Sequence, residues 1–473
     1  MRLECTVVGL DAVEGRGQGG GARTLGGLLM VAAWLLVGCG ETSEDRLREG
    51  ASSLAGGAGH GGRGGAGGSE VGGLPCDAWQ GDLLTGTVQS DELMAIVADP
   101  RGGLLVAGYE AGITGTTNIQ PSGDARGIVR KVASDGSLVW EHRIDTPGTE
   151  TVEDLAVSDD GASIYALGRT SGALAGANQG KFDLFVRTLD GGGAALHTLQ
   201  LGNERPQHPR KLSLDPAGGL VVAGYDDIYV PTNYVAAWQD PFVLRLSPAV
   251  GGGNAQALRL DWWHQDDTSE SDVLLGLGVD VKGDIFVSGS DGAGGESWAN
   301  LRKLAPDGTL RWVHQFSSGM YDAATSVAVS PGGDLFVAGA TFRKLGAAQF
   351  GQQDVFVVRV DAETGVAQWI TQAGWETSDY PMAMTFDAHQ NLYIAGTSTS
   401  LDGMDAGVFA MKLSPSGELV GTWRRDSPAF EEVFGAAVDT CGRLFVVGYT
   451  EGELIPGKLP SGERDGFVML TDL

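Results

Sequence analysis

Cysteine is scarce in this sequence: four occur among 473 residues, which excludes a small fold held together mainly by disulfides. No Cys-x-x-Cys pair, H-E-x-x-H motif or G-x-S-x-G motif is present, so the signatures of zinc sites, metalloproteases and α/β-hydrolases are missing. Basic residues are also few, because 32 Lys and Arg stand against 60 Asp and Glu, for a formal net charge of −28. A surface this acidic repels phosphate groups, and we expect no nucleic-acid partner.

Long apolar runs are also missing, with one exception near the start. Residues 25–37 form an apolar stretch that follows two Arg and is too short to span a bilayer comfortably. It ends in the letters LVGC, which resemble a bacterial lipobox; that resemblance implies lipid attachment to Cys39 and cleavage before it. We therefore expect residues 1–38 to be a lipoprotein signal peptide and the chain to be lipid-anchored in the bacterial cell envelope, at the outer membrane or cell surface. The alternative is a plain signal peptide with an incidental Cys.

Residues 39–78 are rich in Gly and polar side chains. Such a segment cannot bury enough apolar surface to fold. We expect it to act as a flexible tether.

The remainder, residues 79–473, contains seven near-copies of one ten-residue pattern, each ending in Gly. The copies are DPRGGLLVAG, DDGASIYALG, DPAGGLVVAG, DVKGDIFVSG, SPGGDLFVAG, DAHQNLYIAG and DTCGRLFVVG, ending at Gly108, Gly168, Gly224, Gly289, Gly339, Gly396 and Gly448. The interval between successive glycines is about 50–65 residues. A repeat at this period is typical of β-propellers and other repeat folds.

Each unit holds four short strand candidates separated by Gly, Asp or Pro, and no unit shows a sustained helical period. Four antiparallel strands per unit indicate a propeller blade. The seventh unit has only three strands, whereas a spare strand at residues 81–89 precedes the first unit. We therefore predict an all-β, seven-bladed propeller closed by the N-terminal strand in the last blade, and we expect a monomer.

Three stretches, GRTSGALAGANQGKFDLFVRTLD, GYTEGELIPGKLPSGERDGFVML and YDAATSVAVSPGGDLFVAGAT, resemble bacterial SBBP-type β-propeller repeats. The resemblance covers residues 80–473 and implies a bacterial, myxobacterial-like repeat lipoprotein. It implies no particular activity, because that family has none in common. WD40 and kelch signatures are absent.

Acidic residues recur before the innermost strand of five units: Asp91, Asp272, Asp322, Asp379 and Glu431. The other two units place Thr151 and Gln207 there. One interpretation is turn chemistry, in which Asp accepts hydrogen bonds from backbone N–H groups. The other is a ring of carboxylates at the channel mouth that binds Ca²⁺ or a basic partner. We assign no catalytic residue, no dedicated metal ligand and no other cofactor.

Two further features concern the loops and turns. Tyr229, Tyr234 and Trp238 lie in a long insert of the third unit and form either an aromatic contact patch or a hydrophobic plug over the blade. On the opposite face, acids in the turns after the innermost strands are expected to pair with bases at the ends of the third strands. The acids are Asp99, Asp159, Asp215, Asp280, Asp387 and Asp439, and the bases are Lys131, Arg245, Lys303, Arg359 and Lys412.

Processing before Cys39 would leave Cys76 and Cys441 as the thiols of an oxidising compartment. Cys76 precedes the closing strand and Cys441 lies in the last blade, so we predict a disulfide that clamps the closure. The alternative is two unpaired cysteines.

These features favour a non-catalytic binding or scaffolding module for a protein or glycan partner. The alternative is an envelope polysaccharide lyase or glycosidase with its site at the channel mouth. Acids that converge on one side of a deep pocket would favour the enzyme, and acids spread evenly around the ring would favour the binding module.

Overall fold

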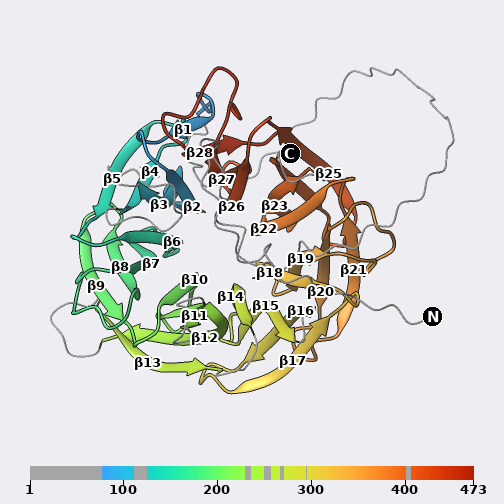
Figure 1. Cartoon of the computed structure of the whole chain (residues 1–473), viewed down its shortest axis with the longest axis horizontal. Helices are drawn as coiled ribbons and strands as arrows, with labels where there is room; N and C mark the ends of the chain where they lie inside the picture. The colour runs from blue at the N-terminus through green and yellow to red at the C-terminus, as the bar shows by residue number, and fades with distance from the viewer. Residues whose placement is uncertain are drawn as a thin grey trace, which may run out of the picture.

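The structure is a computed structural model of the chain, and it describes residues 77–110, 125–229, 236–249, 257–266, 271–293, 296–400 and 406–473. Throughout these residues the regular elements are β-strands (Figure 1). None of the described segments is a helix long and apolar enough to span a membrane. The predicted sites at Cys39, Cys76 and Tyr234 lie outside the described residues.

The strands are β1 (Leu83–Thr85), β2 (Asp91–Ala98), β3 (Leu104–Glu110), β4 (Arg126–Val132), β5 (Leu138–Ile144), β6 (Glu150–Val157), β7 (Ser163–Thr170), β8 (Asp183–Asp190), β9 (Ala195–Leu201), β10 (Gln207–Leu214), β11 (Leu220–Tyr229), β12 (Ala236–Pro248), β13 (Leu258–Gln265), β14 (Asp272–Val279), β15 (Ile285–Ala293), β16 (Glu296–Leu304), β17 (Leu310–Phe316), β18 (Asp322–Val329), β19 (Leu335–Thr341), β20 (Asp354–Val360), β21 (Ala367–Ala373), β22 (Ser378–Phe386), β23 (Leu392–Thr399), β24 (Ala406–Leu413), β25 (Leu419–Asp426), β26 (Glu431–Val438), β27 (Leu444–Thr450) and β28 (Asp465–Leu470).

These strands form seven four-stranded antiparallel sheets arranged as the blades of a propeller around a central channel (Figure 1). Blades 1 to 6 are consecutive groups of four strands from β2 to β25, and blade 7 has the order β1-β28-β27-β26. One strand of each blade, called strand A, lies innermost; it is the first of the four in blades 1 to 6 and β26 in blade 7. Strands B, C and D follow outward, so β1 is strand D of blade 7. The predicted all-β, seven-bladed fold is confirmed.

The ring closes as predicted, because β1 is the outermost strand of blade 7. Leu83, Leu84 and Thr85 pair antiparallel with β28. Just before β1, the ring of Trp79 packs edge-on against Phe445 with 4.7 Å between centroids. Asp82 forms an ion pair of 3.0 Å with Arg425 of blade 6. The N-terminal strand therefore joins the first part of the chain to the last two blades.

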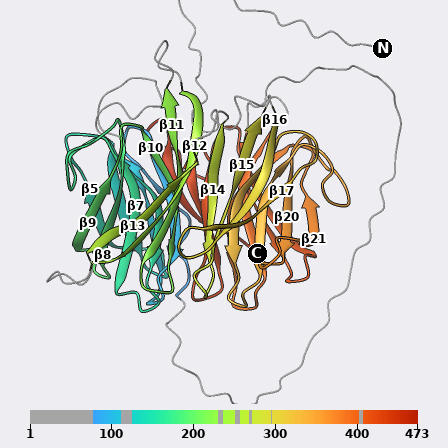
Figure 2. The ribbon, with the colours of Figure 1, turned by 90° about the horizontal axis from the view of Figure 1, so that it is seen from below.

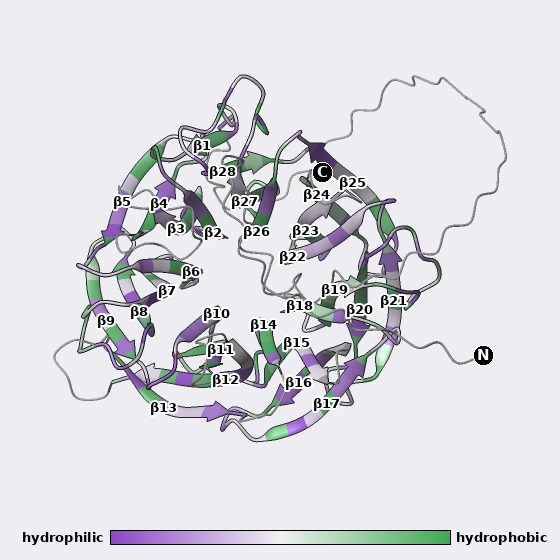
Figure 3. Cartoon of the chain, viewed as in Figure 1, coloured by the Kyte–Doolittle hydropathy of each residue, from purple (hydrophilic) through white to green (hydrophobic). Residues whose placement is uncertain are grey.

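The apolar pattern of the strands explains how the blades pack. Strands B and C are buried almost throughout, whereas the outer strands β5, β9, β13 and β17 alternate between hydrophilic and hydrophobic residues (Figure 3). Aromatic rings fill the spaces between neighbouring blades. Phe336 of blade 5, for example, lies 5.9 Å from the Trp369 ring and 5.5 Å from the Phe386 ring of blade 6. The core is thus a series of layers between blades.

The Gly that ends each repeat pattern is required by a close approach of two backbones. Strand A carries a β-bulge in every blade, as between Ala324 and Ser326 in blade 5. Beside it, a Cβ on Gly339 would lie 2.0 Å from the carbonyl oxygen of Ala323. The equivalent glycines of the other six blades would meet a strand A carbonyl oxygen at 1.7 to 2.3 Å. No side chain can be accommodated at these positions.

The charges predicted to pair at the turns do so in blades 1, 3 and 6. Ion pairs join Lys131 to Asp99, Arg245 to Asp215, Lys412 to Asp387 and, within one turn, Arg443 to Asp439. One acid was assigned wrongly: Lys303 contacts Asp284 at 2.8 Å instead of Asp280. In blade 5, where no turn acid was predicted, Arg359 contacts Asp334 at 2.5 Å. Asp280 instead accepts the N–H groups of Lys282 and Asp284 and so shapes its own turn.

The predicted disulfide site lies where the closing strand begins. Cys441 is in the β26–β27 turn, and its N–H donates to Asp439 at 2.9 Å. Two residues later, Arg443 donates to the carbonyl oxygen of Asp77 at 2.9 Å. Asp77 directly follows Cys76 in the sequence, so the described neighbours of both cysteines meet at this turn. The Cys76–Cys441 bridge itself stays a prediction, because Cys76 lies outside the described residues.

Candidate functional site

One face of the ring carries the starts of the A strands and the B–C loops, and it is called the loop face here. The opposite face carries the A–B and C–D turns and is called the turn face. Figure 2 shows the strands running between these faces, with β11 and β12 extending past the ring at the loop face. Loops held on a rigid scaffold are common places for binding sites.

The predicted ring of acids is at the loop face, but its members are buried in the blades. Asp322 and Asp379 are fully buried, and each accepts the backbone N–H of the residue four positions earlier, at 2.6 and 2.7 Å. Asp379 also accepts the Ser398 hydroxyl at 2.6 Å. Burial raises the pKa of both carboxyls, and the hydrogen bonds oppose that rise. This geometry is the turn chemistry that was one of the two interpretations.

The same arrangement corrects one position of the ring. Glu150, and not Thr151, is the blade 2 equivalent, because Glu150 pairs with Thr170 as Asp91 pairs with Glu110. The A–B turn of blade 2 is one residue longer, which displaced the sequence alignment. Glu150 is fully buried and accepts the Thr146 N–H at 2.9 Å. Asp91, Asp272 and Glu431 are buried as well.

Binding of Ca²⁺ or a basic partner by this ring stays a prediction. Within the described ranges, no group of three or more His, Cys, Asp or Glu side chains is placed to hold a metal ion. The second predicted site, the aromatic insert, is described in part. Trp238 is half-buried on β12 and pairs with Ile228, Tyr229 lies at the end of β11, and Tyr234 lies outside the described residues.

A different aromatic pocket lies on the loop face at the seam between blades 5 and 6. It has a volume of about 690 Å³ and is open to solvent. Phe350 of the blade 5 loop is 50 % exposed, and Trp375 from the connection between the blades lines the other side. The Arg424 guanidinium lies 5.4 Å from the Trp375 ring centroid, and the exposed Glu376 completes the polar lining. The pocket thus combines two aromatic rings with charges of both signs.

The loop that carries Phe350 is held in place by two side chains of its own blade. Gln372 accepts the N–H groups of Leu345 and Gly346, both at 2.8 Å, and donates to Asp354 at 2.7 Å. Asp354 in turn accepts the Phe350 N–H at 2.8 Å. The loop therefore presents Phe350 in a fixed position, which reduces the entropy lost on binding.

Blade 2 repeats this loop and provides an internal comparison. There Gln200 accepts the N–H groups of Leu174 and Ala175, and Asp183 accepts the N–H of Gln179. Gln179 stands where blade 5 has Phe350, and Asn203 stands where the next connection has Trp375. The backbone support is shared, but the aromatic pair is found at one of these two seams.

Sequence reasoning missed this pocket because Phe350 and Trp375 are 25 residues apart and belong to different units. The available signal was their departure from the repeat. Blade 7, which has the same type of loop, places Ser461 at the position of Phe350, since its N–H also bonds the first acid of strand C, Asp465. Phe350 is thus aromatic at a position that is polar in blades 2 and 7, and this difference points to the seam between blades 5 and 6 as a binding site.

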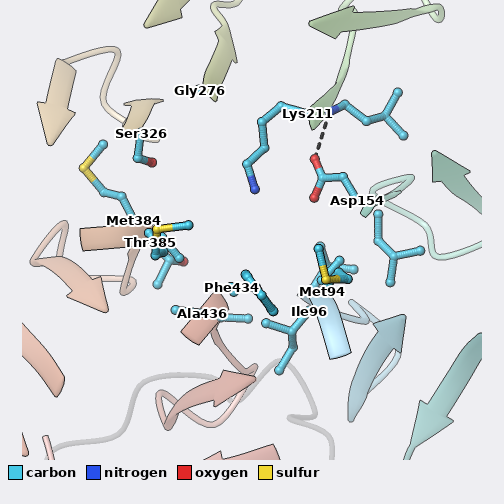
Figure 4. Close-up of a pocket in the computed structure, with 18 of the residues that line it drawn as sticks. Met94, Ile96, Asp154, Lys211, Gly276, Ser326, Met384, Thr385, Phe434 and Ala436 are labelled. Atoms are coloured by element: carbon cyan, nitrogen blue, oxygen red, sulfur yellow. Dashed lines mark hydrogen bonds between the residues drawn. The ribbon is translucent and has the colours of Figure 1, made fainter. Parts of the chain in front are cut away.

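The central channel contains a second pocket, of about 360 Å³ (Figure 4). Its wall is apolar along blades 1, 6 and 7, where Met94, Met384 and Phe434 line it. The wall also includes two charged residues, Asp154 of blade 2 and Lys211 of blade 3. Desolvation raises the pKa of Asp154, and the nearby Lys211 charge opposes the rise.

Nearer the loop face, carboxyl groups gather on one side of the channel mouth. Glu92 and Glu432 lie on neighbouring A strands and are 8 % and 2 % exposed. Arg464 donates to Glu92 at 2.9 Å, and the Tyr449 hydroxyl donates to Glu432 at 3.1 Å. Desolvation, with repulsion from Glu92 added to it, raises the pKa of Glu432 to about 8. At neutral pH Glu432 is therefore mainly the neutral acid.

The raised pKa of Glu432 makes stability depend on pH. The carboxyl ionises near its ordinary value of 4.5 in the unfolded chain and near 8 in the folded chain, so the folded state binds more protons between these values. The free energy of unfolding contributed by this group therefore falls as pH rises from about 4.5 to about 8. We expect Glu432→Gln to remove this loss, and to stabilise the protein relative to wild type at pH 9 by at most about 5 kcal/mol.

Urea unfolding at pH 5 and at pH 9 measures this effect. Glu418→Gln, on the exposed hairpin of blade 6, is the matched control and should leave the pH dependence as in wild type. An E432Q protein that loses as much stability as wild type between the two pH values would contradict the assignment.

Comparison with known proteins assigns no family to the chain. No sequence model of a protein family matches the chain, and no curated protein matches its sequence. Among solved structures, a puromycin hydrolase S511A mutant complexed with PGG is similar with a TM-score of 0.41 and 14 % identity, over 80 % of this chain and 53 % of the other. Sqt1 from Chaetomium thermophilum is similar with a TM-score of 0.43 and 15 % identity, over 82 % and 99 %. The chain spans about half the length of the hydrolase.

Proposed function

We propose that this chain is a lipoprotein of the bacterial cell envelope whose propeller is a non-catalytic binding and scaffolding module, and that a glycan or protein partner docks on the loop face. The observation that carries the proposal is the pocket at the seam of blades 5 and 6, with Phe350, Trp375 and Arg424 around an open volume of about 690 Å³. The lipobox-like residues at Cys39 support the anchoring.

The composition of the pocket suits such a partner. Exposed aromatic rings pack against the C–H face of a sugar ring, and the charged groups of Arg424 and Glu376 can bond its hydroxyls. Trp and Arg are also the residues that contribute most to protein–protein interfaces. The Gln372 and Asp354 bonds hold the loop before binding, so little ordering is needed when the partner arrives.

A second candidate function is an envelope polysaccharide lyase or glycosidase at the channel mouth. The observation that favours it is the uneven distribution of acids: Glu92, Glu153 and Glu432 lie on blades 1, 2 and 7, whereas blades 4 to 6 place uncharged residues at the same strand positions. A neutral Glu432 beside Glu92 has the protonation state of a general acid. All three carboxylates are at most 8 % exposed, and this burial makes the binding module the first choice.

The test is capture of partners from detergent-solubilised envelopes and binding to a glycan array, with wild type and Phe350→Ala. Because Phe350 is half exposed, we expect its removal to leave folding intact and to weaken partner binding about tenfold or more. Gln179→Ala, at the matched position of blade 2, is the control and should bind as wild type does.

Equal binding by wild type and F350A would contradict the proposed pocket. Release of reducing or unsaturated sugar ends from envelope polysaccharide by wild type, and its loss in E432Q, would instead establish the second candidate.

A further inference from the structure

One level of the channel carries a small, uncharged residue in five of the seven blades. It is the first residue after the β-bulge of strand A, and it is Ala95, Gly276, Ser326, Ala383 or Gly435 in blades 1, 4, 5, 6 and 7. Blades 2 and 3 place Asp154 and Lys211 at this level. The repeat alone does not account for two opposite charges on adjacent inner strands.

Asp154 and Lys211 are the two ionisable residues among those that line the channel pocket. An Oδ of Asp154 accepts the N–H of Leu212 at 2.8 Å, which places the carboxylate beside the preceding residue, Lys211 (Figure 4). Lys211 extends into the pocket. Among the described residues its ammonium has no ion-pair partner within 4 Å. A charged group directed into a pocket without a protein partner can bind a ligand charge of opposite sign.

The rest of the wall would contact an apolar group. Met384 of blade 6 and Phe434 of blade 7 lie across from Lys211, and Met94 and Ile96 of blade 1 extend the apolar wall to the side of Asp154 (Figure 4). Met side chains are flexible and polarisable, so they adapt to ligands of different shape. The volume of about 360 Å³ is at the lower end of the range for small-molecule sites.

We propose that the channel pocket binds a small zwitterion with an apolar body, such as an α-amino acid with an aliphatic, thioether or aromatic side chain. The ligand carboxylate pairs with Lys211, the ligand ammonium pairs with Asp154, and the side chain lies against Met94, Met384 and Phe434. A simple anion at Lys211 would be repelled by Asp154, and a simple cation at Asp154 would be repelled by Lys211. A zwitterion pairs with both charges and adds no net charge to the channel pocket.

Burial raises the pKa of Asp154, and a ligand ammonium beside it would offset that cost. The site is separate from the loop-face pocket: they share no residue. The proposal therefore goes beyond the module's binding of a partner, and either one can fail alone.

The test is calorimetric titration of the purified wild-type chain with L-leucine, L-methionine and L-phenylalanine. Two leucine analogues separate the charges: 4-methylpentanoate lacks the ammonium, and 3-methylbutylamine lacks the carboxylate. We expect leucine to bind about tenfold or more tightly than either analogue, because each lost pair leaves a half-buried protein charge without its partner.

Two variants assign the effect to the two residues. In Lys211→Met, leucine should bind no better than 3-methylbutylamine, and in Asp154→Asn it should bind no better than 4-methylpentanoate. Lys282→Met, an exposed Lys on the turn face, should bind as wild type does. The proposal is overturned if wild type binds none of the three amino acids at 10 mM, or if leucine and both analogues bind equally. If a variant fails to fold, the comparison of leucine with its two analogues on the wild-type chain still tests the proposal.

Discussion

A chain that begins at Asp91 should lose its closed ring and melt about 10 °C or more below a chain that begins at Asp77. The shorter chain lacks β1, so blade 7 retains three strands and β28 becomes an exposed edge. It also loses the packing of Trp79 on Phe445 and the ion pair between Asp82 and Arg425. Thermal unfolding followed by circular dichroism, with size-exclusion chromatography to detect association through the open edge, measures the effect.

The closure can also be tested by addition. A synthetic peptide of residues 77–90, supplied to the chain that begins at Asp91, should restore much of the melting temperature, because its strand can pair with β28. A peptide of the same composition in scrambled order is the control and should have no effect. Equal melting temperatures for the two chain lengths would show that β1 does not hold the ring together.

Gly339→Ala should lower the free energy of unfolding by about 3 kcal/mol or more. The added Cβ would lie 2.0 Å from the carbonyl oxygen of Ala323 and 2.6 Å from the Phe356 ring, and both distances are too short for a Cβ. Both atoms belong to central parts of blade 5, so relief requires strand A to move away from strand B. Such a movement would break hydrogen bonds at the bulge and open the packing against blade 6.

Gly176→Ala is the matched control, because a Cβ at Gly176 in the blade 2 loop would meet nothing within 4 Å. The midpoint of urea unfolding should fall for G339A and stay within error for G176A. If G339A unfolds at the same midpoint as wild type, the backbone approach at the bulge is not what requires Gly in each repeat.

Much of this architecture was accessible from the sequence because the repeat exposes it. Seven patterns ending in Gly predict seven copies of one backbone constraint, and the structure attributes that constraint to the strand A carbonyl beside the bulge. The three-stranded seventh unit, together with the spare strand before Asp91, predicts the closure. These inferences needed only order along the chain, which is what fixes pairing between neighbouring strands in a blade.

The sites were less accessible because they depend on departures from the repeat. Thr151 was placed in the acid ring instead of Glu150, since one extra turn residue in blade 2 is invisible without strand pairing. Phe350 and Trp375 meet across a seam between blades, so neither unit contains the pocket. Asp154 and Lys211 belong to consecutive units. Aligning the inner strands by their bulges instead of by their turns would have placed the two residues at equivalent positions.

The contact between Asp77 and Arg443 shows on which face of the ring the described chain begins. It holds the start of the described chain at the β26–β27 turn, on the turn face, whereas Phe350 and Trp375 lie on the loop face. With a lipid on Cys39, as proposed, the tether would connect the membrane to the turn face of the propeller. The receptive side would then point outward from the membrane, toward the surroundings of the cell or a neighbouring envelope layer, and the thickness of the ring would add to the tether in setting how far the module can reach.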